Sequence, residues 1–370
     1  MHHDKEGLDL MERDIERQSE VLAASLPGLR AEAEATVRQL RRPPQRVYLV
    51  GCGDSLDAGL SARFVWERML GVAVEAVPAM TFASSVISLV PPASLVVALS
   101  QSGKVSRVVE GIRAARARGL PTMTITADPQ SPLAREPSDA TFVIDFSKVG
   151  QVPGTTSHLL GILALYELAC AFSKDKGEVI RLREAMDGVS TLVWRAGEIG
   201  RTVATDHASV FHRDTPFLSI GYGPGLAVAR FTVRKFLELT QLLALWQETE
   251  EYAHDEYSLV GSQFCVLQVA PPGRGLARSI EIAQYLRRLD AHVGVVTDES
   301  SAYRFSDAAD VVYALPETHP DLVPLVYSVP GQILSVLVAR LVGGSLYGMA
   351  ERIHREDGDP QIYESEIVVG

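Results

Sequence analysis

The sequence has no excess of basic residues and no long apolar run. Its 370 residues include 35 lysines and arginines against 46 aspartates and glutamates, which gives a formal net charge of −11. This acidic balance, without a basic patch interleaved with aromatic residues, argues against a nucleic-acid binder. No uninterrupted apolar run reaches the length that spans a membrane. We therefore expect neither nucleic acid nor a membrane as a partner.

Cysteine is scarce and shows no paired spacing. The three cysteines, Cys52, Cys170 and Cys265, lie in apolar or glycine-rich surroundings without a CxxC motif. Such residues fit reduced thiols better than disulfides. The first residues, MHHDKEGLDLMERD, are charged and contain no apolar segment typical of a signal peptide. We therefore expect a cytoplasmic protein.

Two common site signatures are incomplete or missing. Gly51 and Gly53 follow a predicted strand, but Leu56 stands where a dinucleotide-binding G-x-G-x-x-G fingerprint has its third glycine. No HExxH pattern is present, and most histidines are scattered. His254 lies among acidic residues, which leaves a metal site open as the alternative to acid–base chemistry. We predict neither a cofactor nor a metal.

The most informative stretch is Leu95 to Val105, reading LVVALSQSGKV. A continuous apolar run ends at Leu99 in the polar turn Ser100 to Gly103, and apolar residues then recur at helical spacing. The pattern predicts a buried strand, a turn and a helix. Free N–H groups and the helix dipole favour an anion there, and hydroxyls can bind it without adding charge. The turn is therefore either a phosphate or sulfonate pocket or a structural serine N-cap.

Alternating strands and helices occupy the chain from Arg46 onward. Repeated βα units of this kind predict parallel sheets covered by helices on both faces. The pattern returns 170 positions later, where 217–225 repeats 47–55 and 293–298 repeats 123–128. The sequence therefore predicts an internal duplication of a whole α/β domain.

The expected organisation has five parts. We expect an N-terminal helical arm at 1–45, a first α/β domain at 46–175, a helical linker at 176–206, a second α/β domain at 207–345 and a tail at 346–370. The arm should contain two helices, at 8–24 and 29–40. Both domains should be doubly wound parallel-sheet sandwiches.

The two copies differ where such sheets bind ligands, beyond the carboxyl ends of the strands. The second copy has Pro271-Pro272-Gly273 in place of the serine turn, and an acidic segment at 247–258 that contains His254. A histidine flanked by acids suits proton transfer, whereas a solvated acidic loop is the alternative. Glu238 lies one helical turn from Lys235, so it is either a carboxylate base or part of a surface ion pair.

Four motifs together resemble the sugar isomerase (SIS) domain family: GCGDS at 51–55, SQSG at 100–103, VPGTTS at 152–157, and KFLE to EYAH at 235–254. The nearest resemblance is to the isomerase half of glucosamine-6-phosphate synthase and to the shorter aminosugar-phosphate deaminases and deglycases. It covers about 46–345, and so both copies. The resemblance implies two tandem SIS domains, a small anionic sugar as ligand, and a homodimer with a shared active site.

The resemblance also implies roles for individual residues. The catalytic glutamate falls on Glu238, the nearby lysine on Lys235, and the ring-opening histidine on His254, which in the synthase comes from a neighbouring subunit. The anion and sugar contacts and the residues that flank them fall on Gly53, Asp54, Ser55, Ser100, Gln101, Ser102, Lys104, Thr155, Thr156 and Ser157.

Several departures separate the sequence from the synthase. The tail after Gly344 has no lysine for a Schiff base, and no glutaminase with a leading cysteine is present. Asp54 and Val105 stand where the family has threonines near the phosphate, and Lys104 is new and could offset Asp54. We expect aldose–ketose isomerisation of an anionic hexose derivative, either a hexose 6-phosphate or a sulfo-sugar. A deaminase, a deglycase and a non-catalytic sugar-phosphate sensor remain alternatives.

Overall fold

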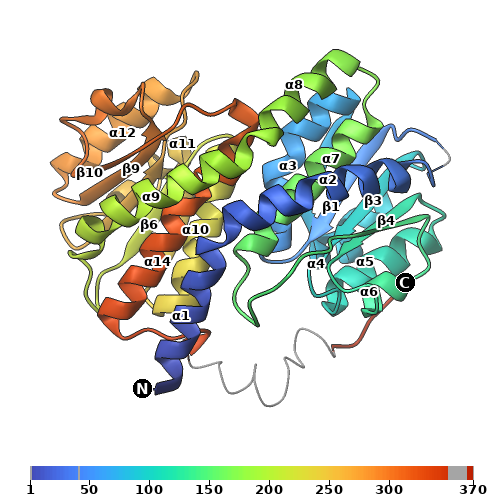
Figure 1. The fold of residues 1–370 in the computed structure, drawn as a ribbon, viewed down its shortest axis with the longest axis horizontal. Coiled ribbons are helices and arrows are strands. Elements are labelled where there is room, and N and C mark those ends of the chain that lie inside the picture. The colour runs from blue at the N-terminus through green and yellow to red at the C-terminus, as the bar shows by residue number, and fades with distance from the viewer. Residues whose placement is uncertain (1, 41, 349–364, 370) are drawn as a thin grey trace. The chain divides into compact units, whose positions relative to one another are not determined.

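The computed structural model describes residues 2–40, 42–348 and 365–369, and within these the chain forms two compact units (Figure 1). The first-copy unit contains 21–40, 42–147, 156–187 and 365–369. The second-copy unit contains 2–20, 148–155 and 188–348. The expected division into arm, domains, linker and tail stays a prediction, and most of the tail lies outside the described residues.

The first-copy unit is built on a five-stranded parallel sheet with the strand order β2-β1-β3-β4-β5. Its strands are β1 (Arg46–Gly51), β2 (Ala73–Pro78), β3 (Ser94–Leu99), β4 (Thr122–Thr126) and β5 (Ala140–Val143). The central strands are buried along almost their whole length, which is why they read as continuous apolar runs. The order reverses between β1 and β3, where such sheets bind ligands.

Helices cover both faces of this sheet. On one face lie α3 (Asp54–Leu70) and the almost wholly buried α7 (Thr156–Phe172), which are joined by a 2.8 Å hydrogen bond from Trp66 Nε1 to the Leu165 carbonyl. On the other face, α5 (Ser106–Ala117) packs with the short α4 (Ala79–Thr81) against alternate residues of β1 and β3. The short α6 (Pro132–Arg135) and the longer α8 (Lys176–Asp187) complete the helices of this unit after residue 46.

The second-copy unit repeats this architecture. Its parallel strands are β6 (Phe217–Gly221), β7 (Ala244–Glu248), β8 (Cys265–Val269), β9 (His292–Asp298) and β10 (Val311–Leu315), in the order β7-β6-β8-β9-β10. The strand order is that of the first copy. Gly53 and Gly223 also precede the first helix of each copy with matching φ of 56° and 52°. The expected duplication is confirmed.

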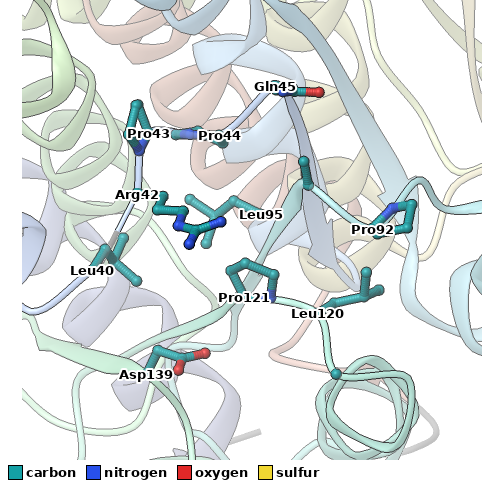
Figure 2. A pocket seen from close by; sticks show the side chains of 12 residues that line it. Leu40, Arg42, Pro43, Pro44, Gln45, Pro92, Leu95, Leu120, Pro121 and Asp139 are labelled. Atoms are coloured by element: carbon teal, nitrogen blue, oxygen red, sulfur yellow. The ribbon is translucent and has the colours of Figure 1, made fainter.

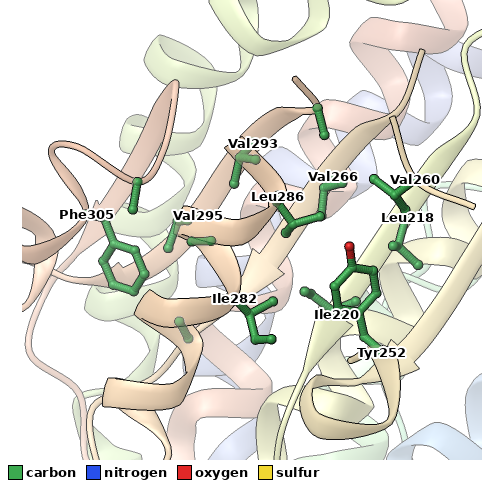
Figure 3. Close-up of a cluster of buried hydrophobic side chains, with 14 of the residues drawn as sticks. Leu218, Ile220, Tyr252, Val260, Val266, Ile282, Leu286, Val293, Val295 and Phe305 are labelled. Atoms are coloured by element: carbon green, nitrogen blue, oxygen red, sulfur yellow. The ribbon is translucent and has the colours of Figure 1, made fainter. Parts of the chain in front are cut away.

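Helices also cover both faces of the second sheet. On one face, α12 (Leu276–Arg288) and α11 (Thr249–Tyr252) enclose a cluster of buried side chains from β6, β8 and β9 (Figure 3). The other face is covered by α9 (Val189–Ala208), α10 (Pro224–Thr240), α13 (Val323–Val326) and α14 (Ser328–Val342). There, the rings of Phe217 and Phe236 stack with centroids 3.8 Å apart.

One helical stretch of the described residues, Pro320–Val342, is long and apolar enough to cross a membrane by length and composition. Its most apolar window is 94% buried inside the structure. A helix that is apolar on all sides is buried in a large core as readily as in lipid. In this fold the stretch forms part of the core of the second-copy unit.

The predicted bounds of the arm helices, 8–24 and 29–40, are wrong. The arm contains α1 (His2–Glu16) and α2 (Gln18–Val37). The break between the two helices is therefore at Arg17, and α2 continues through Pro27. A proline removes one backbone hydrogen bond, but the leucines beside it pack into the core and hold the helix. The stretch 176–206 is helical as expected, and it consists of the two helices α8 and α9, which are separated by Gly188. Strand β7 was not predicted, and its last two residues, Gln247 and Glu248, are the first two of the acidic segment 247–258.

Candidate active site

The serine turn joins β3 to α5. Ser100 Oγ accepts a hydrogen bond from the N–H of Gly103 at 3.1 Å, and Ser102 Oγ accepts one from Lys104 at 3.3 Å. The residue before α5 is Val105, which offers no side-chain cap, so neither serine is the N-cap of α5. The alternative of a structural turn stays open, because both hydroxyls accept backbone N–H groups within the turn. Ser100 is buried, whereas Ser102 is half-buried and Lys104 exposed. A hydroxyl and a cation are therefore reachable at the start of α5, as an anion site requires.

Gln101 connects this turn to the start of α7. Its Nε2 donates to the Ser157 carbonyl at 2.6 Å. Thr156, the first residue of α7, is buried, and Ser157 is half-buried. The structure thus brings together two of the predicted motifs, SQSG and the end of VPGTTS.

The third predicted motif of this site lies at the start of α3. Gly53 has a positive φ of 56° and Asp54 is the first helical residue. The Asp54 carbonyl lies 3.1 Å from His158 Nδ1 in α7. Three helix N-termini, those of α3, α5 and α7, therefore meet beyond the carboxyl edge of the first sheet. Their dipoles favour an anion, while the Asp54 carboxylate opposes one.

Thr155 belongs to the second-copy unit. It is fully buried, and its hydroxyl donates a hydrogen bond to the carboxylate of Asp14 in α1. Its side chain is therefore enclosed within the protein, whereas the side chains of Ser55 and Ser102 in the first-copy unit are half-buried.

Glu238 and Lys235 form a pair on α10. Lys235 Nζ lies 2.6 Å from Glu238 Oε2, and the lysine side chain is 0% exposed while that of Glu238 is 30% exposed. The ammonium also lies 4.9 Å from the centre of the Phe231 ring. The alternative of a surface ion pair is therefore wrong. A buried cation needs a countercharge, so it fixes an ionised carboxylate that still reaches solvent.

His254 follows α11 in a turn and its side chain is 70% exposed. Its Nε2 lies 3.9 Å from Glu250 Oε1. Arg278 donates to both oxygens of Glu250, at 2.7 and 3.0 Å, and holds the pKa of that carboxyl below its usual value. Glu248 caps α11 by accepting from two backbone N–H groups. These two acids of the segment therefore have structural partners, which the sequence did not indicate.

The second copy closes the position that corresponds to the serine turn. The Tyr222 hydroxyl donates to the Pro271 carbonyl at 2.5 Å, and its ring lies where a Cβ on Gly275 would be only 2.5 Å away. Tyr222 stands where the first copy has Cys52. The large Tyr222 at the position of the small Cys52 indicates in the sequence that the second turn is filled, and this signal was missed.

A cavity of about 540 Å³ lies at the other edge of the first sheet (Figure 2). Leu95, Leu120 and Pro121 line it at the amino ends of β3 and β4, and Arg42 reaches into it. Ligands of open α/β sheets bind beyond the carboxyl ends of the strands. We therefore place the candidate site at the serine turn.

Within the described residues, no three histidine, cysteine, aspartate or glutamate side chains gather as metal ligands. The first-copy unit presents hydroxyls, an amide and helix N-termini, which can bind an anion. The second-copy unit presents a lysine-bound carboxylate, which can exchange a proton.

Comparison with known proteins shows what this chain resembles. Glutamine–fructose-6-phosphate aminotransferase (isomerizing) of Thermus thermophilus is 27% identical over 342 residues, which are 90% of this chain and 56% of that protein. The chain thus spans about half the length of the curated relatives that it matches.

Solved structures share the fold. The C-terminal domain of glucosamine-fructose-6-phosphate aminotransferase from Francisella tularensis superposes with a TM-score of 0.81 at 22% identity, covering 92% of this chain and 97% of that one. Tagatose-6-phosphate ketose/aldose isomerase from Escherichia coli gives 0.74 at 18% identity, covering 92% and 94%. The family model for the SIS domain matches 39–169 and 217–341, which is once in each copy. The chain therefore belongs to the SIS domain family.

Proposed function

We propose that the protein is an aldose–ketose isomerase for an anionic hexose derivative, either a hexose 6-phosphate or a sulfo-sugar. The observation that carries the proposal is the pair in which buried Lys235 holds Glu238 at 2.6 Å with the carboxylate still accessible. Such a carboxylate stays ionised and in one orientation, as a general base for C–H proton transfer requires. The names of similar proteins, an isomerizing aminotransferase and a ketose/aldose isomerase, support this class of reaction.

The proposed reaction passes through a cis-enediol. His254 opens the sugar ring, Glu238 takes the proton from C2 of the aldose, and the same carboxyl returns it to C1 of the ketose. The serine turn holds the anionic end of the sugar through Ser55, Ser100 and Ser102. Binding energy from that remote group then orients the reacting carbons.

We further propose that the protein acts as a homodimer. His254 is exposed on its own chain and contacts Glu250. An exposed side chain of this kind can serve the active site of the partner, as the resemblance implies.

Glu238→Gln tests the proposal, because it keeps the shape of the side chain and removes the base. Turnover of hexose 6-phosphate should fall by about 10² or more, the usual scale for loss of a general base. Binding should persist, and deuterium from solvent should no longer enter C1 or C2 of recovered sugar.

The matched control is Glu198→Gln on α9. Glu198 pairs with Arg201 at the same i,i+3 spacing but is exposed to solvent. Loss of that pair should cost a few tenths of a kcal/mol of stability and no rate. A Glu238→Gln enzyme that turns over and exchanges deuterium like the parent would contradict the proposal.

The same assays separate the alternatives. Ammonia released from glucosamine 6-phosphate, without turnover of glucose 6-phosphate, would replace the isomerase with an aminosugar-phosphate deaminase, and release of an amino acid from a glycated substrate would indicate a deglycase. Tight binding without turnover of any sugar would indicate a sensor.

A further inference from the structure

The segment 148–155, which leads into α7, is held by the N-terminal helix α1. The fully buried Thr155 hydroxyl donates to the carboxylate of Asp14, whose own exposure is 7%. Nearby, Leu10 packs so closely on Gly150 that a Cβ there would lie 2.8 Å from Leu10 Cδ2. Two contacts therefore fix this segment against one face of α1.

Helix α1 is itself fastened to α14. Arg340 in α14 donates to Asp9 and to Glu12 in α1, each at 2.7 Å. Just after α1, Gln18 Nε2 donates to Gln332 Oε1 at 2.6 Å in a buried amide pair. Asp14 therefore lies on a helix that hydrogen bonds from Arg340 and the Gln18–Gln332 pair hold against α14.

A buried carboxylate is an unusual means of holding a loop. Ionised groups are costly to bury, and an apolar pair of similar size would pack without that cost. A carboxylate that accepts a hydroxyl hydrogen bond, in contrast, fixes a direction as well as a contact. The arrangement favours precise placement of Thr155 over stability alone.

Placement of Thr155 matters because the next two residues belong to the candidate site. The backbone passes directly from Thr155 into Thr156 and Ser157, and the Ser157 carbonyl receives the hydrogen bond from Gln101 of the serine turn. We propose that Asp14 is a positioning residue for the sugar site. Through Thr155 it sets where the chain enters α7, and so where Ser157 and Gln101 meet. The inference rests on the proposed function of the serine turn.

Thr155→Val removes the hydroxyl while it keeps the size and branching of the side chain. We expect KM for a hexose 6-phosphate to rise about tenfold, the scale of one lost hydrogen bond to a charged group, with kcat within about threefold of the parent. Asp14→Ala should give the same change, and the double variant should be no worse than either single one. Thr155→Ser restores the hydroxyl and should restore KM.

Asp9→Asn is the matched control. It weakens one contact of α1 with Arg340 and leaves 148–155 untouched, so its KM should equal that of the parent. A KM unchanged in Thr155→Val, or raised equally in Asp9→Asn, would overturn the inference. If Thr155→Val does not fold, Asp14→Asn is measured in its place. Its KM should also rise about tenfold, and an unchanged KM would overturn the inference.

A second readout does not depend on turnover. Hydrogen exchange of the free protein should accelerate about tenfold or more in peptides that cover 148–158 of Thr155→Val, and not in the rest of the chain. If the parent turns over no sugar, the proposed function fails while this measurement still tests the role of Asp14. Exchange at the parental rate in 148–158, or faster exchange throughout the second-copy unit, would overturn it.

Discussion

Gly103 shows how a single residue can set the shape of a site. Its φ is +63°, a conformation that L side chains rarely adopt, and a Cβ would lie 2.0 Å from Ser131 Oγ. The backbone carbonyl of Gly103 also accepts a hydrogen bond from Leu133 at 2.9 Å. The serine turn is therefore closed on the side away from the proposed ligand, and only glycine fits there.

Gly103→Ala should be strongly destabilising. A left-handed backbone costs an alanine about 1–2 kcal/mol, and the overlap with Ser131 should add roughly 1–3 kcal/mol. Gly119→Ala provides the control, because Gly119 has a similar φ of +67° and open space around it. Urea unfolding and binding of hexose 6-phosphate should show a larger loss for Gly103→Ala on both measures. Equal losses for the two variants would mean that the space at Gly103 does not matter.

His207 is a buried imidazole in the core of the second-copy unit. Its Nδ1 lies 3.0 Å from the Tyr313 hydroxyl, and its ring packs on His292 with centroids 5.3 Å apart. Burial, and then the neighbouring His292, lower the pKa of His207 to about 3. Asp310 and Arg287 lie beside His292 and form an ion pair with each other.

This histidine should make the protein sensitive to acid. Folding lowers the pKa of His207. The unfolded chain therefore binds a proton at this residue below about pH 6.5, whereas the folded chain binds it only below about pH 3. Stability should therefore fall as the pH falls through this window, by up to about 1.4 kcal/mol per pH unit from this group.

The comparison of variants isolates the effect of His207 from that of the carboxylates. Urea midpoints between pH 7 and pH 5 should decline less steeply for His207→Gln than for the parent. His212→Gln removes an exposed histidine of the same unit and should leave the parental slope. A parental slope in His207→Gln would contradict the assignment.

At this scale the sequence offered candidate residues but not their surroundings. Glu238, Lys235 and the serine turn stay predictions as site residues, and the complete burial of Lys235 was not predicted, because nothing in a helical pattern distinguishes a buried cation from an exposed one. Asp14 was missed for the same reason. Its buried side chain accepts a hydrogen bond from a hydroxyl 141 positions away in the sequence.

At the scale of the element, periodicity located most strands and helices but not their ends. β7 escaped prediction because it is a short edge strand that exposes Trp246 and ends in Gln247 and Glu248, so its apolar run is shorter than those of its neighbours. α2 was divided in two because Pro27 and Gly28 are the strongest helix-breaking signal in the arm. The packing of leucines on either side overrides that signal.

Gly28 therefore gives a stabilising substitution. It lies inside α2, and no atom lies within 4 Å of the place that an alanine Cβ would take, so the methyl group meets no obstacle. Gly28→Ala should raise the free energy of unfolding by about 0.5–1 kcal/mol, the difference in helix propensity between the two residues. Turnover should not change. A loss of stability in thermal or urea unfolding would show that the helix at Pro27 needs the freedom of glycine.

At the scale of the whole molecule, the duplication was the most reliable prediction. A repeat of 170 residues is visible in the sequence because both copies must bury the same kind of central strand and turn sharply at the same glycines, Gly53 and Gly223. The difference between the two turns was also visible, since SQSG in one copy corresponds to a turn with two prolines in the other. The sequence did not predict that 2–20 and 148–155 belong to the second-copy unit, because this assignment depends on contacts between distant segments.

The complete burial of Lys235 has a consequence for chemical labelling. The chain has only six lysines, at positions 5, 104, 148, 174, 176 and 235. An amine-reactive ester should acylate the exposed Lys104 quickly in the folded protein, and Lys235 only while the second-copy unit is open. Mass spectrometry of the peptide that carries position 235 should then give the opening rate directly. Rapid acylation of Lys235 at the rate of Lys104 would mean that the amine is not enclosed.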